Sequence, residues 1–147
     1  MRRAMDENIL EVREHSGEGY KPLVDYGSWR VAILRFQDRM LPEHQSSMER
    51  HLETDEVFVL TKGSALIVLG GSGPEVGTLT LRTMEIGKIY NIRKNTWHTL
   101  SLSREASVVI VENQNTGKDN SEYAELSQEQ RKWIQERAGR EVQSWNA

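Results

Sequence analysis

The stretch from Glu49 to Gly63 reads ERHLETDEVFVLTKG, and its spacing decides both the expected fold and the expected site. Glu49 and His51 are two residues apart, so their side chains share one face if this segment is a strand. Glu53–Asp55 can form a tight turn, after which Glu56 begins a returning strand close to His51. The stretch therefore predicts two carboxylates and one imidazole beside one another.

Strand alternation predicts that two of the polar side chains point toward the core. Glu56 shares its face with two apolar residues of the run EVFVLT, and His98 does the same in the run HTLSLS. A buried carboxylate is rare unless it is paired, hydrogen-bonded or bound to a metal. We therefore expect an inward cluster of nitrogen and oxygen atoms from His51, Glu56 and His98, with Glu49 beside it.

Composition limits the classes of protein that the chain can belong to. It has 147 residues, 19 Lys and Arg against 22 Asp and Glu, and no Cys. One domain with a substantial core fits this length, and disulfides, thiolate zinc sites and iron–sulfur clusters are excluded. The mixed charge shows no basic stripe, so no nucleic-acid partner is expected. The apolar runs are too short for a bilayer and no leader is recognised, so we expect a cytoplasmic protein without a membrane partner.

Short β runs fill the middle of the chain, and turn signals recur about every 8–12 residues, as in all-β sandwiches and barrels. The predicted strands are Trp29–Phe36, Glu56–Thr61, Ser64–Leu69, Val76–Arg82, Lys88–Ile92, His98–Ser103 and Ala106–Glu112. Lys62 and Gly63 separate two of these runs, which predicts a β-hairpin from Glu56–Thr61 and Ser64–Leu69.

The two ends of the chain differ from this middle part. Residues 1–21 are expected to form an N-terminal arm, either extended or as a short helix around Ile9, Leu10 and Val12, and residues 22–112 to form the β-domain. Residues 113–147 begin as a polar loop. Ser127 and Gln130 then fit a capping box, which predicts a helix over Gln128–Ala138 that ends at Gly139 and packs on the β-domain.

The two polar segments resemble the two motifs of the cupin superfamily. His51, Glu56 and Gly63 match the second His, the Glu and the closing Gly of the first motif, and Gly87 and His98 match the second motif at the right separation. The resemblance implies a small antiparallel β-barrel of the jelly-roll type with a pocket inside it. It also implies a homodimer and a small-molecule ligand.

The chain departs from both motifs at several positions. Glu49 stands where the first motif has its first His, and Glu43 stands at its leading Gly. In the second motif Arg93 replaces Pro, Asn95 replaces Gly and Leu102 replaces the final Asn. Asn tolerates the left-handed backbone conformation that a tight turn can require, so the change at Asn95 is mild.

Two imidazoles and one carboxylate form a ligand set that suits Mn, Fe, Ni or Zn with open positions for substrate. Glu49 has three interpretations: a fourth ligand, a general acid or base, or an outward charge at a strand edge. The alternative for the whole cluster is a hydrogen-bonded pocket wall without metal.

Four further side chains are candidates for a substrate pocket. Tyr90 and Trp97 flank the second motif, where they either line a ligand site or pack in the core. Arg35 either clamps an anionic substrate or lies on a solvated face. His44 follows Pro42 in a loop, so it either reaches the pocket mouth or is exposed.

Since cupins include isomerases, epimerases, lyases and dioxygenases, the resemblance implies a metal-dependent isomerase or lyase for a small sugar or a hydroxy or keto acid. Glu49 is the candidate catalytic residue. The alternative is a non-catalytic or regulatory module that binds a small molecule without metal. A third possibility is a dimerising β-domain without ligand, which requires Glu49 and Glu56 to be exposed or paired in salt bridges.

Overall fold

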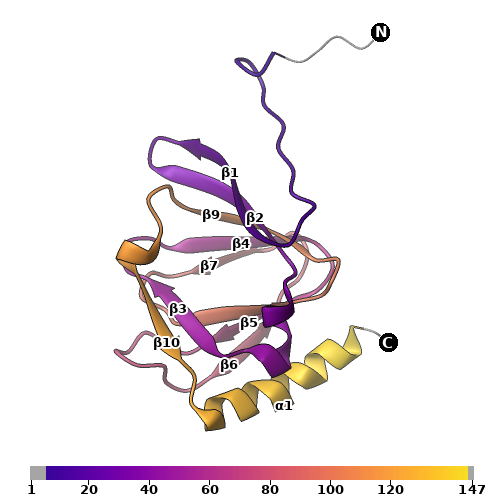
Figure 1. The fold of residues 1–147 in the computed structure, drawn as a ribbon, viewed down its shortest axis with the longest axis vertical. Helices are drawn as coiled ribbons and strands as arrows, with labels where there is room; N and C mark the ends of the chain where they lie inside the picture. Colours follow the sequence, from indigo (N-terminus) through magenta and orange to yellow (C-terminus); the bar gives the residue numbers. More distant parts are fainter. Residues whose placement is uncertain (1–5, 146–147) are drawn as a thin grey trace.

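The computed structural model describes residues 6–145, which form two five-stranded sheets and one long helix (Figure 1). Sheet A has the order β1 (Gly19–Tyr26), β2 (Trp29–Arg35), β9 (Ser107–Asn113), β4 (Glu56–Lys62) and β7 (Ile89–Ile92). Sheet B has the order β10 (Ser121–Glu125), β3 (Ser47–His51), β8 (His98–Leu102), β5 (Ala65–Leu69) and β6 (Thr80–Thr83). Short 3-10 turns lie at Asp38–Met40, Pro42–His44 and Lys118–Asn120. All strand pairs are antiparallel, which confirms the all-β jelly-roll prediction.

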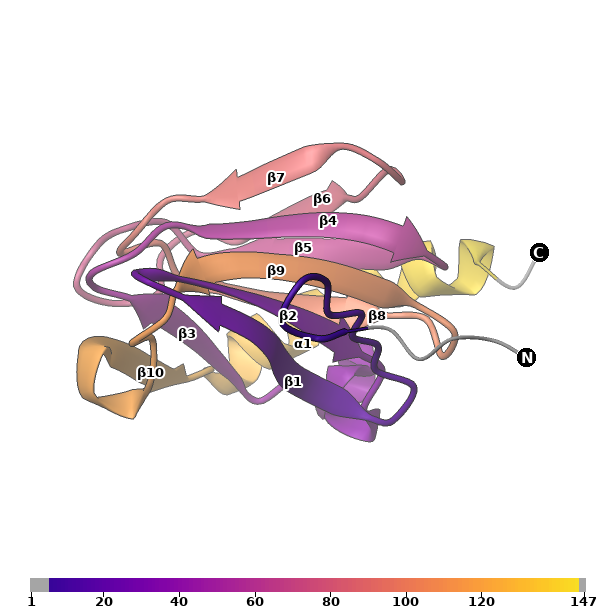
Figure 2. The same cartoon turned by 90° about the horizontal axis from the view of Figure 1, so that it is seen from above.

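The main core lies between the two sheets, and in the view from above sheet A lies over sheet B (Figure 2). Its side chains come from alternate positions of the strands, because successive residues point to opposite faces. From sheet A the core takes Ala32, Leu34, Phe58, Leu60, Val108 and Ile110, and from sheet B it takes Ala65, Ile67, Leu100 and Leu102. The same alternation places Glu56 and His98 on core-facing positions, as predicted.

The predicted hairpin between Glu56–Thr61 and Ser64–Leu69 is wrong. β4 pairs with β7 and β9 in sheet A, whereas β5 pairs with β6 and β8 in sheet B. The turn at Gly63 therefore carries the chain from one sheet to the other. β5 has four consecutive buried residues, ALIV, because sheet A covers one of its faces and the helix α1 (Gln128–Ser144) covers the other.

The strands extend beyond the predicted β-domain at both ends. β1 begins at Gly19, and β10 lies in the segment expected to be a polar loop. Both are edge strands that pair on one side only, so the polar sequence SEYAE can form β10 without an apolar run. Among residues 6–18 the structure shows no helix, and Ile9, Leu10 and Val12 are exposed.

Helix α1 begins at the predicted capping box and ends later than predicted. The Gln130 N–H donates to Ser127 Oγ at 3.1 Å, and the Ser127 N–H donates to Gln130 Oε1 at 2.8 Å. The helix continues past Gly139 to Ser144 because its apolar side extends through Ile134 and Ala138 to Trp145. It covers the outer face of sheet B, where it packs on Met48, Leu66, Val68 and Trp97. Within residues 6–145, no helix has the length and apolar character needed to cross a membrane.

We predict that Gly63→Ala destabilises the fold more than Gly71→Ala. Both glycines have a φ of +77°, but a Cβ at Gly63 would lie 2.7 Å from the Ala106 Cα, whereas a Cβ at Gly71 would meet nothing within 4 Å. Backbone strain costs about 1–2 kcal/mol at each site, and the clash adds to it only at Gly63. Urea unfolding of the two variants checks this, and equal losses of unfolding free energy would contradict it.

Candidate metal centre

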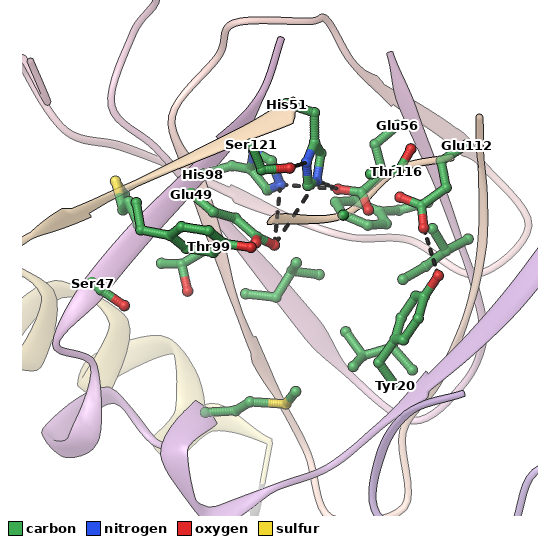
Figure 3. Close-up of a pocket in the computed structure, with 18 of the residues that line it drawn as sticks. Tyr20, Ser47, Glu49, His51, Glu56, His98, Thr99, Glu112, Thr116 and Ser121 are labelled. Atoms are coloured by element: carbon green, nitrogen blue, oxygen red, sulfur yellow. Dashed lines mark hydrogen bonds and ion pairs between the residues drawn. The ribbon is translucent and has the colours of Figure 1, made fainter. Parts of the chain in front are cut away.

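One cavity of about 390 Å³ opens between the sheets, and the four side chains predicted to form the site meet in it (Figure 3). Glu49 and His51 come from β3, Glu56 from β4 and His98 from β8. Glu49 lies directly opposite His98 in the pairing of β3 with β8, so one register places two of these residues side by side. Because β4 belongs to the other sheet, Glu56 approaches the same point from across the sandwich.

Two loops hold the motif segments together at this end of the sandwich. The Asp55 carboxylate accepts the Lys94 N–H at 2.8 Å, and the Asn95 N–H donates to the His51 carbonyl at 2.7 Å. Asn95 has a φ of +67°, the left-handed conformation expected for this replacement of Gly. The turn after β3 and the turn before β8 are therefore joined by hydrogen bonds.

The carboxylate of Glu56 lies at the centre of the cluster. Its Oε1 is 2.9 Å from His98 Nε2 and 3.3 Å from His51 Nε2. Glu49 Oε1 is 4.0 Å from each of the same two nitrogens. One ligand atom from each of the four residues lies within 4.8 Å of all the others. Glu56 and both histidines are buried, whereas 40% of the Glu49 side chain is exposed.

The outer ring nitrogens of the two histidines have their own partners. His98 Nδ1 lies 2.9 Å from the Thr96 carbonyl, which can only accept, so Nδ1 carries the proton and Nε2 of the neutral ring carries a lone pair. His51 Nδ1 lies 2.8 Å from Ser121 Oγ. His51 Nε2 is buried without a hydrogen-bond partner among the described residues, and such an atom is costly. The two nitrogens and two carboxylates fit a divalent transition metal.

Neighbouring charges within the cluster shift the pKa of each group in the direction opposite to the effect of burial. Burial alone would raise the pKa of Glu56, but the hydrogen bond from His98 and the positive charge of the nearby His51 and His98 rings lower that pKa well below its usual range. Burial would lower the pKa of each histidine, but Glu56 raises both. Without a metal, the cluster therefore holds protons between its nitrogens and the carboxylate.

Sequence reasoning missed a further buried carboxylate in the cavity, that of Glu112 on β9. Its side chain is 6% exposed, and Glu112 Oε1 accepts a hydrogen bond from the Tyr20 hydroxyl at 2.5 Å. Burial and the neighbouring Glu56 raise the pKa of Glu112 to about 7. Glu112 shares one face of β9 with the buried apolar residues Val108 and Ile110, so the alternation argument that placed Glu56 inward applies to Glu112 too.

The four predicted pocket residues lie outside the cavity lining. The Tyr90 hydroxyl accepts the Glu85 N–H at 2.8 Å, and Trp97 packs beneath α1 on the outer face of sheet B. Arg35 alternates with the core residue Leu34, so it lies on the outer face of sheet A. His44 is exposed and lies 3.0 Å from Asp38. Tyr90 and Trp97 therefore pack against apolar side chains, and Arg35 and His44 lie on the outside of the molecule, as the second interpretation of each residue expected.

We predict that Glu112→Gln stabilises the metal-free protein more at pH 8 than at pH 5. The pKa of Glu112 is about 7 in the fold against a usual value of 4.5, so the folded state loses stability as the pH rises through this window. Gln cannot ionise, so the variant avoids this loss. Urea unfolding at both pH values measures it, with the exposed Glu43→Gln as the control. An equal difference from wild type at both pH values would contradict the prediction.

Comparison with known proteins supports the fold. No family model matches the chain, and no curated protein matches it by sequence. Among solved structures, a cupin-2 domain protein from Shewanella frigidimarina has a TM-score of 0.49 and 17% identity over 70% of this chain and 85% of its own. A variant of Streptomyces PAC13 solved with uridine has a TM-score of 0.51 and 11% identity, and the match covers 78% of this chain and 85% of that one.

CapF, solved with an inhibitor, has a TM-score of 0.54 and 10% identity over 78% of this chain and 34% of its own. These identities are low, so the similarity concerns the arrangement of the strands. For PAC13 and CapF, whose TM-scores exceed 0.5, that arrangement agrees with the two antiparallel sheets of this chain. The chain therefore has the cupin jelly-roll fold, which confirms the resemblance that its motifs indicated.

Proposed function

We propose that this chain is a metal-dependent enzyme for small molecules, an isomerase or lyase that acts on a small sugar or a hydroxy or keto acid. His51, Glu56, His98 and Glu49 would hold one divalent ion of Mn, Fe, Ni or Zn. The observation that carries the proposal is the buried Nε2 of His51, which faces two carboxylates and has no hydrogen-bond partner among the described residues. Among the solved structures of similar fold, a PAC13 variant was solved with the small molecule uridine, which supports a small-molecule ligand.

Each residue of the cluster has a distinct role in this proposal. Thr96 and Ser121 orient the two rings, so that both Nε2 atoms point at the same place. Glu56 supplies negative charge from the opposite sheet. Glu49 Oε1 borders the open side of the cluster and can accept a proton from a bound ligand. A bound ion would act as a Lewis acid on a ligand carbonyl or hydroxyl.

The second candidate is a binding module without metal. It is favoured by the contacts of Glu56 with His98 at 2.9 Å and with His51 at 3.3 Å, which pair the buried carboxylate without an ion. In this alternative, the side chains of the cluster line one side of the cavity and bind a small ligand by hydrogen bonds.

We predict that the purified protein binds one transition-metal ion, and that His51→Ala and His98→Ala each weaken this binding at least about 10-fold. The matched control is His44→Ala, because His44 is exposed and lies outside the cavity. Metal analysis and calorimetric titration measure the effect. Wild-type protein that binds no ion, yet is stabilised by a small ligand in the presence of EDTA, would support the metal-free module instead.

We also propose that the chain forms a homodimer through the outer face of sheet A. That face carries the half-buried side chains Val31, Ile33, Val57, Val59, Val109 and Val111, which alternate with the core residues of the same strands. Helix α1 covers the corresponding face of sheet B, but no helix within residues 6–145 covers this one. Contiguous apolar surfaces of this kind commonly mark protein interfaces.

We predict a solution mass of twice the 16.9 kDa of one chain, and its reduction to one chain by Val109→Lys. The lysine would place a charge at the centre of the apolar face, whereas the control Ile86→Lys changes an exposed side chain outside the strands. Light scattering coupled to size-exclusion chromatography measures the mass. A monomeric wild type would contradict this interface.

A further inference from the structure

The charged groups around the cavity are unevenly distributed. Three carboxylates line it, those of Glu49, Glu56 and Glu112, together with the two histidines of the cluster. Among the described residues, the one Lys or Arg in the lining is Arg39. Arg39 is exposed at a 3-10 turn, and its Nε donates to Gln37 Oε1 at 2.9 Å. The buried end of the cavity therefore contains carboxylates and no permanently cationic side chain.

A bound divalent ion does not give this end an excess of positive charge. Histidine ligands bind a metal as neutral rings, so the two positive charges of the ion are balanced by Glu49 and Glu56. Glu112 adds either no charge or one negative charge. An anionic ligand beside the cluster would therefore meet no compensating charge, and such a group is costly to bury.

The remaining lining suits a ligand with hydroxyl groups. The Tyr20 hydroxyl donates to the Glu112 carboxylate, and this pair lines the cavity beside the Glu56 end of the cluster, where the Tyr20 oxygen and the second Glu112 oxygen can accept hydrogen bonds from a ligand (Figure 3). Hydroxyl groups of Ser47, Thr99, Thr116 and Ser121 also line the cavity. Between them lie the apolar side chains of Leu34, Met40, Leu100 and Ile110. Hydroxyl edges with C–H faces, as in a sugar or polyol, match this mixture.

We infer that the cavity selects an uncharged, polyhydroxylated ligand over a carboxylate, and holds it between the metal cluster and the Tyr20–Glu112 pair. This inference rests on the proposed metal-dependent function and narrows its ligand class from sugars or acids to sugars and related polyols. It also assigns Tyr20 and Glu112 to ligand binding.

The test compares two five-carbon probes, xylitol and xylonate, which differ mainly in the charge of one end group. In calorimetric titrations of the full chain loaded with Mn²⁺, we expect xylitol to bind at least about 10-fold more tightly than xylonate. This corresponds to a difference of about 1.4 kcal/mol in binding free energy. Glu49→Gln removes one negative charge from the cluster, so it should improve the affinity for xylonate relative to that for xylitol by about 10-fold or more. Glu43→Gln is the matched control, because it removes the same charge from an exposed turn outside the cavity.

A second variant tests the Tyr20–Glu112 pair. Tyr20→Phe removes one hydroxyl, so it should weaken xylitol by about 5-fold or more, typical of one lost hydrogen bond in a closed site. The affinity for Mn²⁺ is expected to stay within about 3-fold of wild type, because Tyr20 is not one of the four clustered residues.

The outcomes separate the two proposals. Wild-type protein that binds none of the Mn, Fe, Ni and Zn ions would overturn the metal-dependent function, and if it binds one of the others, that ion replaces Mn²⁺ in the titrations. Protein that binds Mn²⁺ but prefers xylonate, or does not bind xylitol at all, would overturn the selection of uncharged ligands and leave the metal site standing. An unchanged xylitol affinity in Tyr20→Phe would remove Tyr20 from the binding site.

Discussion

The buried carboxylate of Glu56, held between His51 and His98, is the constraint on which the rest of the site depends. An ionised carboxylate costs several kcal/mol to bury unless it is paired and hydrogen-bonded. Here the partners come from the other sheet, at 2.9 and 3.3 Å. The charge pairing therefore links sheet A to sheet B at the cavity end, and the sandwich cannot shift there without leaving a carboxylate unpaired.

The outer faces of the two sheets differ in what covers them. Sheet B is covered by α1, so that β5 is buried on both sides and Trp97 becomes part of a second core. Sheet A presents valines and an isoleucine on its outer face. The cavity between the sheets is lined by the polar cluster together with side chains of the main core such as Leu34 and Ile110, and the hydrogen bonds of Asp55 and Asn95 join the turns beside the cluster.

Much of the site could be predicted because strand alternation is a local property. Glu56 and His98 each share a strand face with apolar residues, which already predicted that both side chains point inward. Glu49 and His51 are two residues apart on one strand, which predicted that they share a face. The same reasoning applied to Glu112 would have added a third carboxylate. Tyr20 carried no such signal, since it lies on an edge strand that contains few apolar residues. Tyr90 and Trp97 were chosen because they flank the second motif, and Arg35 because it lies in a predicted strand, and neither reason decides the face that a side chain occupies.

By itself, the sequence determined which side chains face inward, where the turns fall, where α1 begins, and that any metal site must use nitrogen and oxygen ligands. The tertiary structure decided which strands pair, and thereby which of those inward side chains share one cavity. The failed hairpin at Gly63 shows the difference, because the turn is visible in the sequence but its two strands enter opposite sheets. Alternation has a period of two and needs only neighbouring residues, whereas strand pairing depends on contacts between segments far apart in the chain.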